Sequence, residues 1–234
     1  MSKSLYIAEK PSVAQEFANA LKINGRRSDG YIESEQAIVT WCVGHLVTMS
    51  YPECYDPKYK RWSLETLPFL PKEFKYEVIP SVEKQFKIVS GLLNRPDVDT
   101  IYVCTDSGRE GEYIYRLVAQ MADVKDKAQK RVWIDSQTEE EILRGIREAK
   151  DETEYDNLSA SAYLRAKEDY LMGINFSRLL TLKYGQNISN YLRTGKNTVI
   201  SVGRVMTCVM GMVIRREREI RDFVKTPFYR VLST

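Results

Sequence analysis

Short apolar runs alternate with stretches of helical periodicity through the first two thirds of the chain. Runs of strand length are expected to form strands at 5–8, 30–33, 37–41, 100–104 and 131–134. Apolar positions at helical spacing predict helices over 12–21, 81–94, 109–121 and 138–150. Ser12 has the sequence context of a helix N-cap. Strands that alternate with helices imply βαβ units and a mainly parallel sheet.

The pattern changes after the charged segment 150–155. Helical periodicity then dominates, over about 156–184 and 204–223, and a further strand is expected only at 228–232. We therefore expect an α/β domain over 1–152, followed over 153–234 by a mostly α-helical segment that enters a strand of another domain. Residues 51–80 hold five prolines and many aromatics, so they are expected to form an ordered, irregular excursion.

Composition and charge exclude few classes of protein. The net charge of +3 is too small to argue for nucleic-acid binding by itself. The sequence shows no apolar run of membrane-helix length and no secretory signal pattern, so we expect no membrane association and a cytoplasmic location. Four cysteines without a C-x-x-C pair, and a single histidine, match no zinc module. Free thiols are the simplest interpretation.

Acidic side chains follow two of the predicted strands. Glu9 and Lys10 come after the first strand, and Asp106 comes after the strand at 100–104, with Glu110 at the start of the next helix. If the two strands are neighbours, these side chains converge at the carboxyl edge of the sheet, where α/β proteins bind ligands. Carboxylate oxygens suit Mg²⁺. Glu9 is a candidate proton donor or acceptor, and Lys10 is a candidate phosphate contact.

A purely structural interpretation of the same acids stays open. Acidic residues at a helix start favour the helix dipole, and Glu112 with Arg116 has the spacing of an i,i+4 ion pair. The alternative role for Glu112 is that of an additional carboxylate available to a metal site.

Basic residues of the second segment are candidates for phosphate contacts. Arg165 and Asp169 lie four residues apart on one predicted helix, which alone indicates only an exposed ion pair. The small-residue turn 201–203 enters a helix at Arg204, and backbone N–H groups at such a turn can bind a phosphate. Arg204 could add bidentate contacts. A plain helix start with a solvated arginine is the alternative.

Together, the motifs resemble a known family. Ala8-Glu9-Lys10-Pro11-Ser12 followed by Thr105-Asp106-Ser107-Gly108-Arg109-Glu110-Gly111-Glu112 resembles the Toprim domain of type IA DNA topoisomerases, in the form of the bacterial topoisomerase III branch. The resemblance implies a Rossmann-like Toprim fold, a proton-transferring role for Glu9, and one Mg²⁺ held by Glu9, Asp106 and Glu110. Gly108 stands where the D-x-D-x-E pattern has its second aspartate, so a second metal ion is not expected.

Later segments resemble consecutive motifs of the same family, which line a groove for single-stranded DNA. The implied DNA-binding residues are Arg61, Arg165, Asp169, Arg178, Ser201, Val202, Gly203, Arg204, Val205 and Met206. His45, in Gly44-His45-Leu46, is a weaker candidate.

The resemblance implies that the parent protein is a Mg²⁺-dependent, ATP-independent isomerase that cuts, passes and rejoins one DNA strand. None of the fifteen tyrosines has the context of the family's nucleophile, so this chain alone is expected not to cut DNA. The sequence contains no phosphate-binding glycine loop of the Walker type, so we expect no nucleotide cofactor. Two alternatives remain: another Toprim enzyme of primase or nuclease type, or a DNA-binding module without catalysis.

Overall fold

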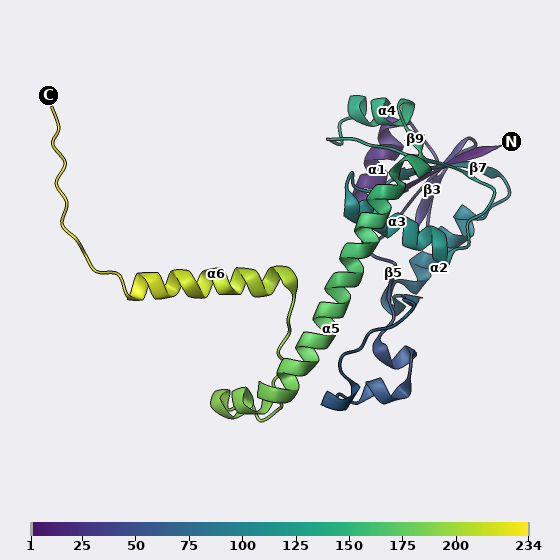
Figure 1. Cartoon of the computed structure of the whole chain (residues 1–234). Coiled ribbons are helices and arrows are strands. Elements are labelled where there is room, and N and C mark those ends of the chain that lie inside the picture. Colours follow the sequence, from purple (N-terminus) through teal and green to yellow (C-terminus); the bar gives the residue numbers. More distant parts are fainter. Residues whose placement is uncertain (1, 234) are drawn as a thin grey trace. The chain divides into compact units, whose positions relative to one another are not determined.

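The structure, a computed structural model, describes residues 2–233 (Figure 1). The chain divides into two compact units. The first unit combines Met1–Tyr55 with Pro71–Lys167, and the second combines Asp56–Leu70 with Glu168–Thr234. Among the described residues, no helix is both long and apolar enough to cross a membrane.

The first unit is built on a seven-stranded sheet with the order β2-β3-β4-β1-β7-β8-β9. Its four central strands run parallel: β4 (Ala37–Trp41), β1 (Lys3–Ala8), β7 (Val98–Cys104) and β8 (Ala128–Arg131). The outer strands pair antiparallel: β2 (Arg26–Ser28), β3 (Tyr31–Glu33) and β9 (Lys150–Asp151). The expected α/β fold with a mainly parallel sheet is confirmed.

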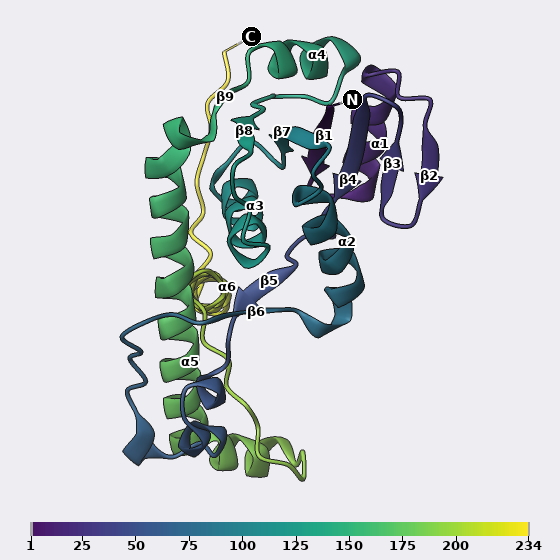
Figure 2. The same ribbon diagram turned by 90° about the vertical axis from the view of Figure 1, so that its right-hand side faces the viewer.

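Helices cover both faces of this sheet (Figure 2). One face carries α1 (Pro11–Ala20) and α4 (Glu139–Arg147), and the other carries α2 (Glu83–Leu93) and α3 (Arg109–Met121). Alternate residues of β1 enter the two cores, since Leu5 belongs to the α2–α3 core and Tyr6 to the α1–α4 core. A strand buried on both faces needs a continuous apolar run, as the sequence has there.

Shorter elements complete the two units. A two-stranded ribbon pairs β5 (Val47–Met49) with β6 (Tyr76–Val78). The 3-10 turns are η1 (Pro52–Cys54), η2 (Pro57–Lys60), η3 (Leu64–Thr66), η4 (Pro80–Val82) and η5 (Glu152–Tyr155). The expectation of an ordered, irregular excursion over 51–80 therefore agrees with the structure, apart from the added strand β6.

Three local predictions in the first unit were wrong or incomplete. Helix α1 begins at Pro11, with Lys10 at the N-cap position, so Ser12 is not the cap. Proline is favoured at the first helical position because its missing N–H is not needed there. The strand expected at 131–134 lies at Ala128–Arg131 instead. Val132 and Ile134, which follow it, pack against Gly145 of α4. The short strands β2 and β9 have no apolar alternation to reveal them.

The second unit contains most of α5 (Asp156–Leu192), a helix of 37 residues that begins in the first unit, and α6 (Arg204–Arg221). Asn175 of α5 holds the irregular segment 56–70. Its Nδ2 donates to the Phe69 carbonyl at 2.9 Å, and its Oδ1 accepts from the Phe69 N–H at 2.6 Å.

Helix α6 and the residues after it are exposed. The side chains of Met206 and Met210 on α6 are more than half exposed. The strand expected at 228–232 is absent, and Tyr229 and Val231 are almost fully exposed. A strand requires a partner for its backbone hydrogen bonds, and none of the strands in residues 2–233 pairs with this segment.

Candidate metal and nucleic-acid sites

The carboxyl edge of the parallel sheet places Glu9 and Asp106 at the ends of adjacent strands. Strands β1 and β7 pair in parallel with Ala8 opposite Cys104, and the two acids follow directly. The condition set by the sequence, that these two strands be neighbours, is met. Glu9 is buried, with 7% exposure, and its Oε2 has no hydrogen-bond donor among the described residues. Its Oε1 lies 3.6 Å from Lys10 Nζ.

Glu110, on the first turn of α3, has a different partner. Its Oε1 lies 2.6 Å from Nε2 of His45, and both side chains are substantially exposed. His45 follows Gly44, whose φ is +83° and whose N–H donates to the Glu9 carbonyl at 3.3 Å. The loop between β4 and β5 therefore contacts both the Glu9 backbone and the Glu110 side chain.

The expected three-carboxylate cluster is not assembled in this geometry. Across residues 2–233, no three His, Cys, Asp or Glu side chains lie close enough together to hold a metal ion. The donor chemistry nevertheless fits a hard cation, because a buried carboxylate oxygen without a donor at Glu9 lies one strand away from the exposed carboxylate of Asp106.

The turn between β7 and α3 is closely packed. Thr105 Oγ1 donates to the Gly111 carbonyl at 2.8 Å, and a Cβ at Gly111 would come within 2.1 Å of the Asp106 carbonyl oxygen. A cavity of about 330 Å³ lies beside the turn and is lined by Asp106 and Ser107, among others. Gly108 is different: its backbone is extended, and nothing lies within 4 Å of an added Cβ.

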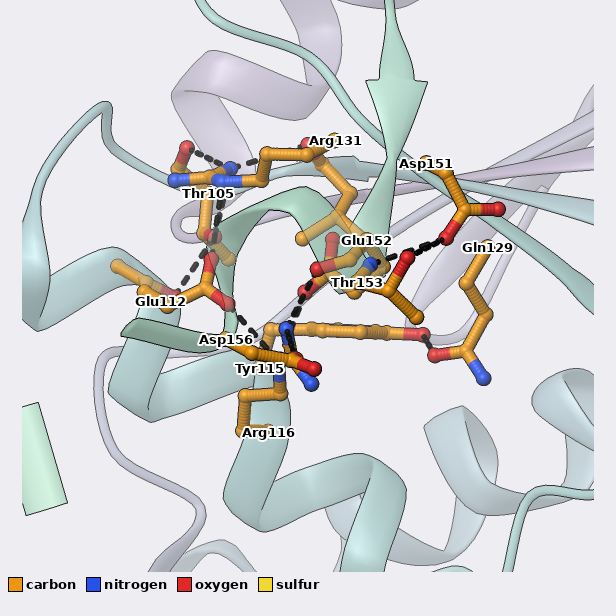
Figure 3. A network of polar contacts seen from close by, with 12 residues as sticks. Thr105, Glu112, Tyr115, Arg116, Gln129, Arg131, Asp151, Glu152, Thr153 and Asp156 are labelled. Atoms are coloured by element: carbon orange, nitrogen blue, oxygen red, sulfur yellow. Dashed lines mark hydrogen bonds and ion pairs between the residues drawn. The ribbon is translucent and has the colours of Figure 1, made fainter. Parts of the chain in front are cut away.

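A buried network of ion pairs lies behind this edge (Figure 3). Glu112 is 0% exposed, and its carboxylate pairs with Arg116 Nε at 2.8 Å and with Arg131 Nε at 3.2 Å. The expected i,i+4 pair is therefore present. Glu112 cannot serve as the spare acid of a metal site, because it is sealed from solvent between two guanidinium groups.

Glu152 extends the network from the segment before α5. Its Oε1 lies 3.2 Å from Arg116 Nε, and Arg116 also reaches Asp156 Oδ1 at 2.9 Å. Burial, followed by the negative charge of Glu112, raises the pKa of Glu152 to about 8. Sequence reasoning missed both Glu152 and Arg131, since charged residues in a charged segment are usually solvated.

All four cysteines are free, as expected. Burial raises the pKa of the Cys42 thiol, which lies near Glu9, to about 12. Cys42 is therefore an inert thiol at neutral pH.

The basic residues expected to contact DNA differ in their surroundings. Arg61 and Arg165 are exposed. Arg178 is only 4% exposed: its Nη1 donates to the Tyr59 carbonyl at 3.0 Å, and its guanidinium lies 5.3 Å from the ring centre of Trp62. Arg178 thus links the 56–70 segment to α5.

Arg204 forms an ion pair within the second unit. Its Nε and Nη2 donate to the two carboxylate oxygens of Asp169 at 2.9 and 3.2 Å, and this hydrogen bonding raises the pKa of Arg204. The i,i+4 spacing alone indicated an ion pair of Asp169 with Arg165, and the structure gives Asp169 a partner on α6.

Two backbone N–H groups of the turn before α6 form hydrogen bonds within the chain. The Val202 N–H donates to Ser177 Oγ at 2.8 Å, and the Gly203 N–H donates to Thr207 Oγ1 at 3.1 Å. Gly203 occupies the N-cap position and has no side-chain cap. Ser201, Val205 and Met206 are exposed. The N–H groups of Val202 and Gly203 are therefore already used, and those of the first turn of α6 are better placed to bind an anion.

Comparisons with known proteins agree with this architecture. A family model described as the Toprim domain matches residues 4–136, and the chain belongs to that family. A second model, described as DNA topoisomerase, matches residues 153–234. The resemblance to type IA DNA topoisomerases is confirmed at this level.

Two curated relatives show which member of the class the chain is similar to. It is 41% identical to DNA topoisomerase 3 of Bacillus subtilis (strain 168) over 231 residues, which cover 99% of this chain and 30% of that protein. It is 43% identical over 227 residues to DNA topoisomerase 3 of Staphylococcus epidermidis, covering 97% of this chain and 30% of the relative. The chain thus spans about 30% of the length of the curated relatives it matches.

Proposed function

We propose that this chain forms the Toprim domain, over 1–152, and the start of the adjoining helical domain, over 153–234, of a type IA DNA topoisomerase that works in the cytoplasm. The main support is the parallel pairing of β1 with β7, which sets Glu9 beside Asp106 at the carboxyl edge of the sheet. The similarity to DNA topoisomerase 3 along nearly the whole chain supports the same conclusion.

We propose one Mg²⁺, held by Glu9, Asp106 and Glu110. When bound, it would neutralise phosphodiester charge and stabilise an attacking or leaving oxygen. Glu9 would hold or transfer a proton at its carboxylate, and Lys10 would contact the phosphate as a point charge. Glu110 would exchange its His45 partner for the cation. Gly108 contributes no carboxylate, which supports one ion instead of two.

We propose that the second unit binds single-stranded DNA through Arg61, Asp169, Arg178 and the start of α6 at 201–206, which includes Arg204. Arg165, on the part of α5 that belongs to the first unit, is proposed as a separate DNA contact. In the whole protein, cutting, passing and rejoining a strand without ATP would use a tyrosine that we do not assign within this chain. The exposed guanidinium groups and the N–H groups of the first turn of α6 are suited to phosphate.

Calorimetric titration with Mg²⁺ tests the metal site. The double variant Asp106→Asn with Glu110→Gln should lose Mg²⁺ binding, whereas Glu16→Gln with Glu35→Gln, which removes the same charge from exposed positions, should keep it. Undiminished affinity in the first variant, or no binding by the unaltered chain, would reject the site.

Fluorescence anisotropy with a labelled oligonucleotide tests the DNA-binding surface. Binding should favour a single strand over the same sequence as duplex and should weaken with salt, because phosphate contacts release counterions. Arg204→Ala should weaken binding about tenfold and lower the salt slope by roughly one, as expected for one lost phosphate contact. Arg216→Ala, an equal charge loss on α6, is the control. Equal affinity for duplex would favour a Toprim enzyme of another type.

A further inference from the structure

Arg131 is the largest fully buried side chain of the described chain. It ends β8, and its guanidinium spreads over the turn that carries Asp106. Nη1 donates to the carbonyls of Val103 at 3.0 Å and Thr105 at 2.8 Å, and to Thr105 Oγ1 at 3.2 Å. Nη2 donates to the Asp106 carbonyl at 2.6 Å. One side chain thus binds the end of β7 and the first residues after it, and Figure 3 shows its guanidinium beside Thr105.

Burying a guanidinium is unfavourable unless its charge and its donors are all matched. Here Glu112 provides the opposite charge, 3.2 Å from Nε, and Trp133 lies with its ring centre 5.5 Å from the guanidinium carbon. The Nε–H group itself makes no hydrogen bond within the described residues, whereas both terminal nitrogens donate to the turn. An apolar residue would fill the same space without desolvating a charge. The specific gain from arginine is its planar fork of donors, which fixes several carbonyl oxygens in one arrangement.

Other contacts hold the same turn. Thr105 Oγ1 bonds the Gly111 carbonyl at the start of α3, and Ser107 Oγ accepts from the Ile134 N–H at 2.9 Å. All these interactions act on the backbone or on small hydroxyls. The Asp106 side chain itself remains exposed. The result is a fixed backbone with an outward carboxylate, which is the arrangement a cation ligand requires.

We propose that Arg131 is a positioning residue for the cation site: by holding the Thr105–Asp106 backbone, it sets the place of the Asp106 carboxylate. This inference rests on the proposed function of Asp106 as a Mg²⁺ ligand. Loss of a residue that orients a metal ligand typically lowers metal affinity 10–100-fold, and we expect a loss of about tenfold here.

The test compares Arg131→Lys with Arg116→Lys in the whole chain. Lysine keeps the charge beside Glu112 but can donate from only one nitrogen, so it releases most of the turn. Arg116 pairs with the same Glu112 but with none of residues 103–106, so it controls for general damage to the network. Hydrogen–deuterium exchange of the peptide 104–111 reports the turn, and calorimetry reports Mg²⁺ affinity.

Faster exchange of 104–111 together with about tenfold weaker Mg²⁺ binding in Arg131→Lys alone would support the proposal. Unchanged exchange, or equal effects in both variants, would overturn it. A loosened turn with undiminished Mg²⁺ affinity would overturn only this inference, whereas an unaltered chain without Mg²⁺ affinity would overturn the proposed function as well. If Arg131→Lys does not fold, the same two measurements on Arg131→Gln decide, and unchanged exchange of 104–111 with unchanged Mg²⁺ affinity would reject the proposal.

Discussion

The buried carboxyl of Glu152 should make the stability of the first unit depend on pH. Burial and the charge of Glu112 raise its pKa from an ordinary value of 4.5 to about 8. Arg116, 3.2 Å from Glu152 Oε1, and Arg131 favour the charged form but do not reverse the shift. The folded chain therefore holds a proton on Glu152 that the unfolded chain releases between these two pH values.

The sign follows from that difference in bound protons. Because the folded state binds the extra proton, the contribution of Glu152 to stability is complete below pH 4.5 and is lost as the pH rises through about 8. Each pH unit over which the folded state holds one proton more than the unfolded state changes the free energy of unfolding by about 1.4 kcal/mol. We expect the chain to lose at least about 2 kcal/mol between pH 5 and pH 8.

Urea unfolding from pH 5 to pH 9, followed by circular dichroism, measures this change. The chain has one histidine, so few other groups titrate in this interval. Glu152→Gln should flatten the dependence and be more stable than the unaltered chain at pH 8.5. Glu154→Gln removes an exposed neighbouring carboxylate and should keep the original dependence.

Two results would contradict this reasoning. The first is a chain whose stability rises from pH 5 to pH 8. The second is a Glu152→Gln variant that retains the same slope as the unaltered chain, since the proton would then bind elsewhere.

Three further predictions concern the packing of the turn at Gly111, Mg²⁺ binding at Gly108, and the 56–70 segment of the second unit. Gly111→Ala should destabilise the chain by about 2–4 kcal/mol in thermal unfolding, because the new Cβ would collide with the Asp106 carbonyl; a variant as stable as the original would show that the turn can move. Gly108→Asp meets open space and should bind Mg²⁺ about tenfold more tightly in calorimetry by adding a carboxylate; weaker binding would refute its position at the site. Arg178→Ala should free the 56–70 segment for tryptic cleavage, since it removes the contact to the Tyr59 carbonyl, and unchanged digestion would contradict that role.

The elements with a strong apolar signal were predictable from the sequence. The parallel strands β1 and β7 are buried on both faces, and α3 has its predicted bounds, because local apolar spacing alone determines them. The edge strands β2 and β9 were missed, since they are short, charged and formed only by pairing with neighbours. The strand expected at 228–232 does not form. Its residues suit a strand, but the described residues provide no partner strand for it.

The candidate site was predictable in its residues but not in its partners. Glu9 and Asp106 follow from the rule that ligands gather at the carboxyl ends of strands. The attachment of Glu110 to His45, the burial of Arg178 and the pairing of Arg204 with Asp169 each depend on residues distant in sequence. Periodicity carries no information about such contacts, and a charged residue is solvated in most proteins.

Both edge strands of the seven-stranded sheet are poorly suited to pairing with an additional strand. On one side β2 is three residues long and includes Arg26 and Arg27, and on the other β9 consists only of Lys150 and Asp151. A second chain that tried to add a strand would find few free backbone groups and would have to approach charged side chains. The sheet is therefore protected against edge-to-edge aggregation while its centre, buried on both faces, holds the acids of the candidate site.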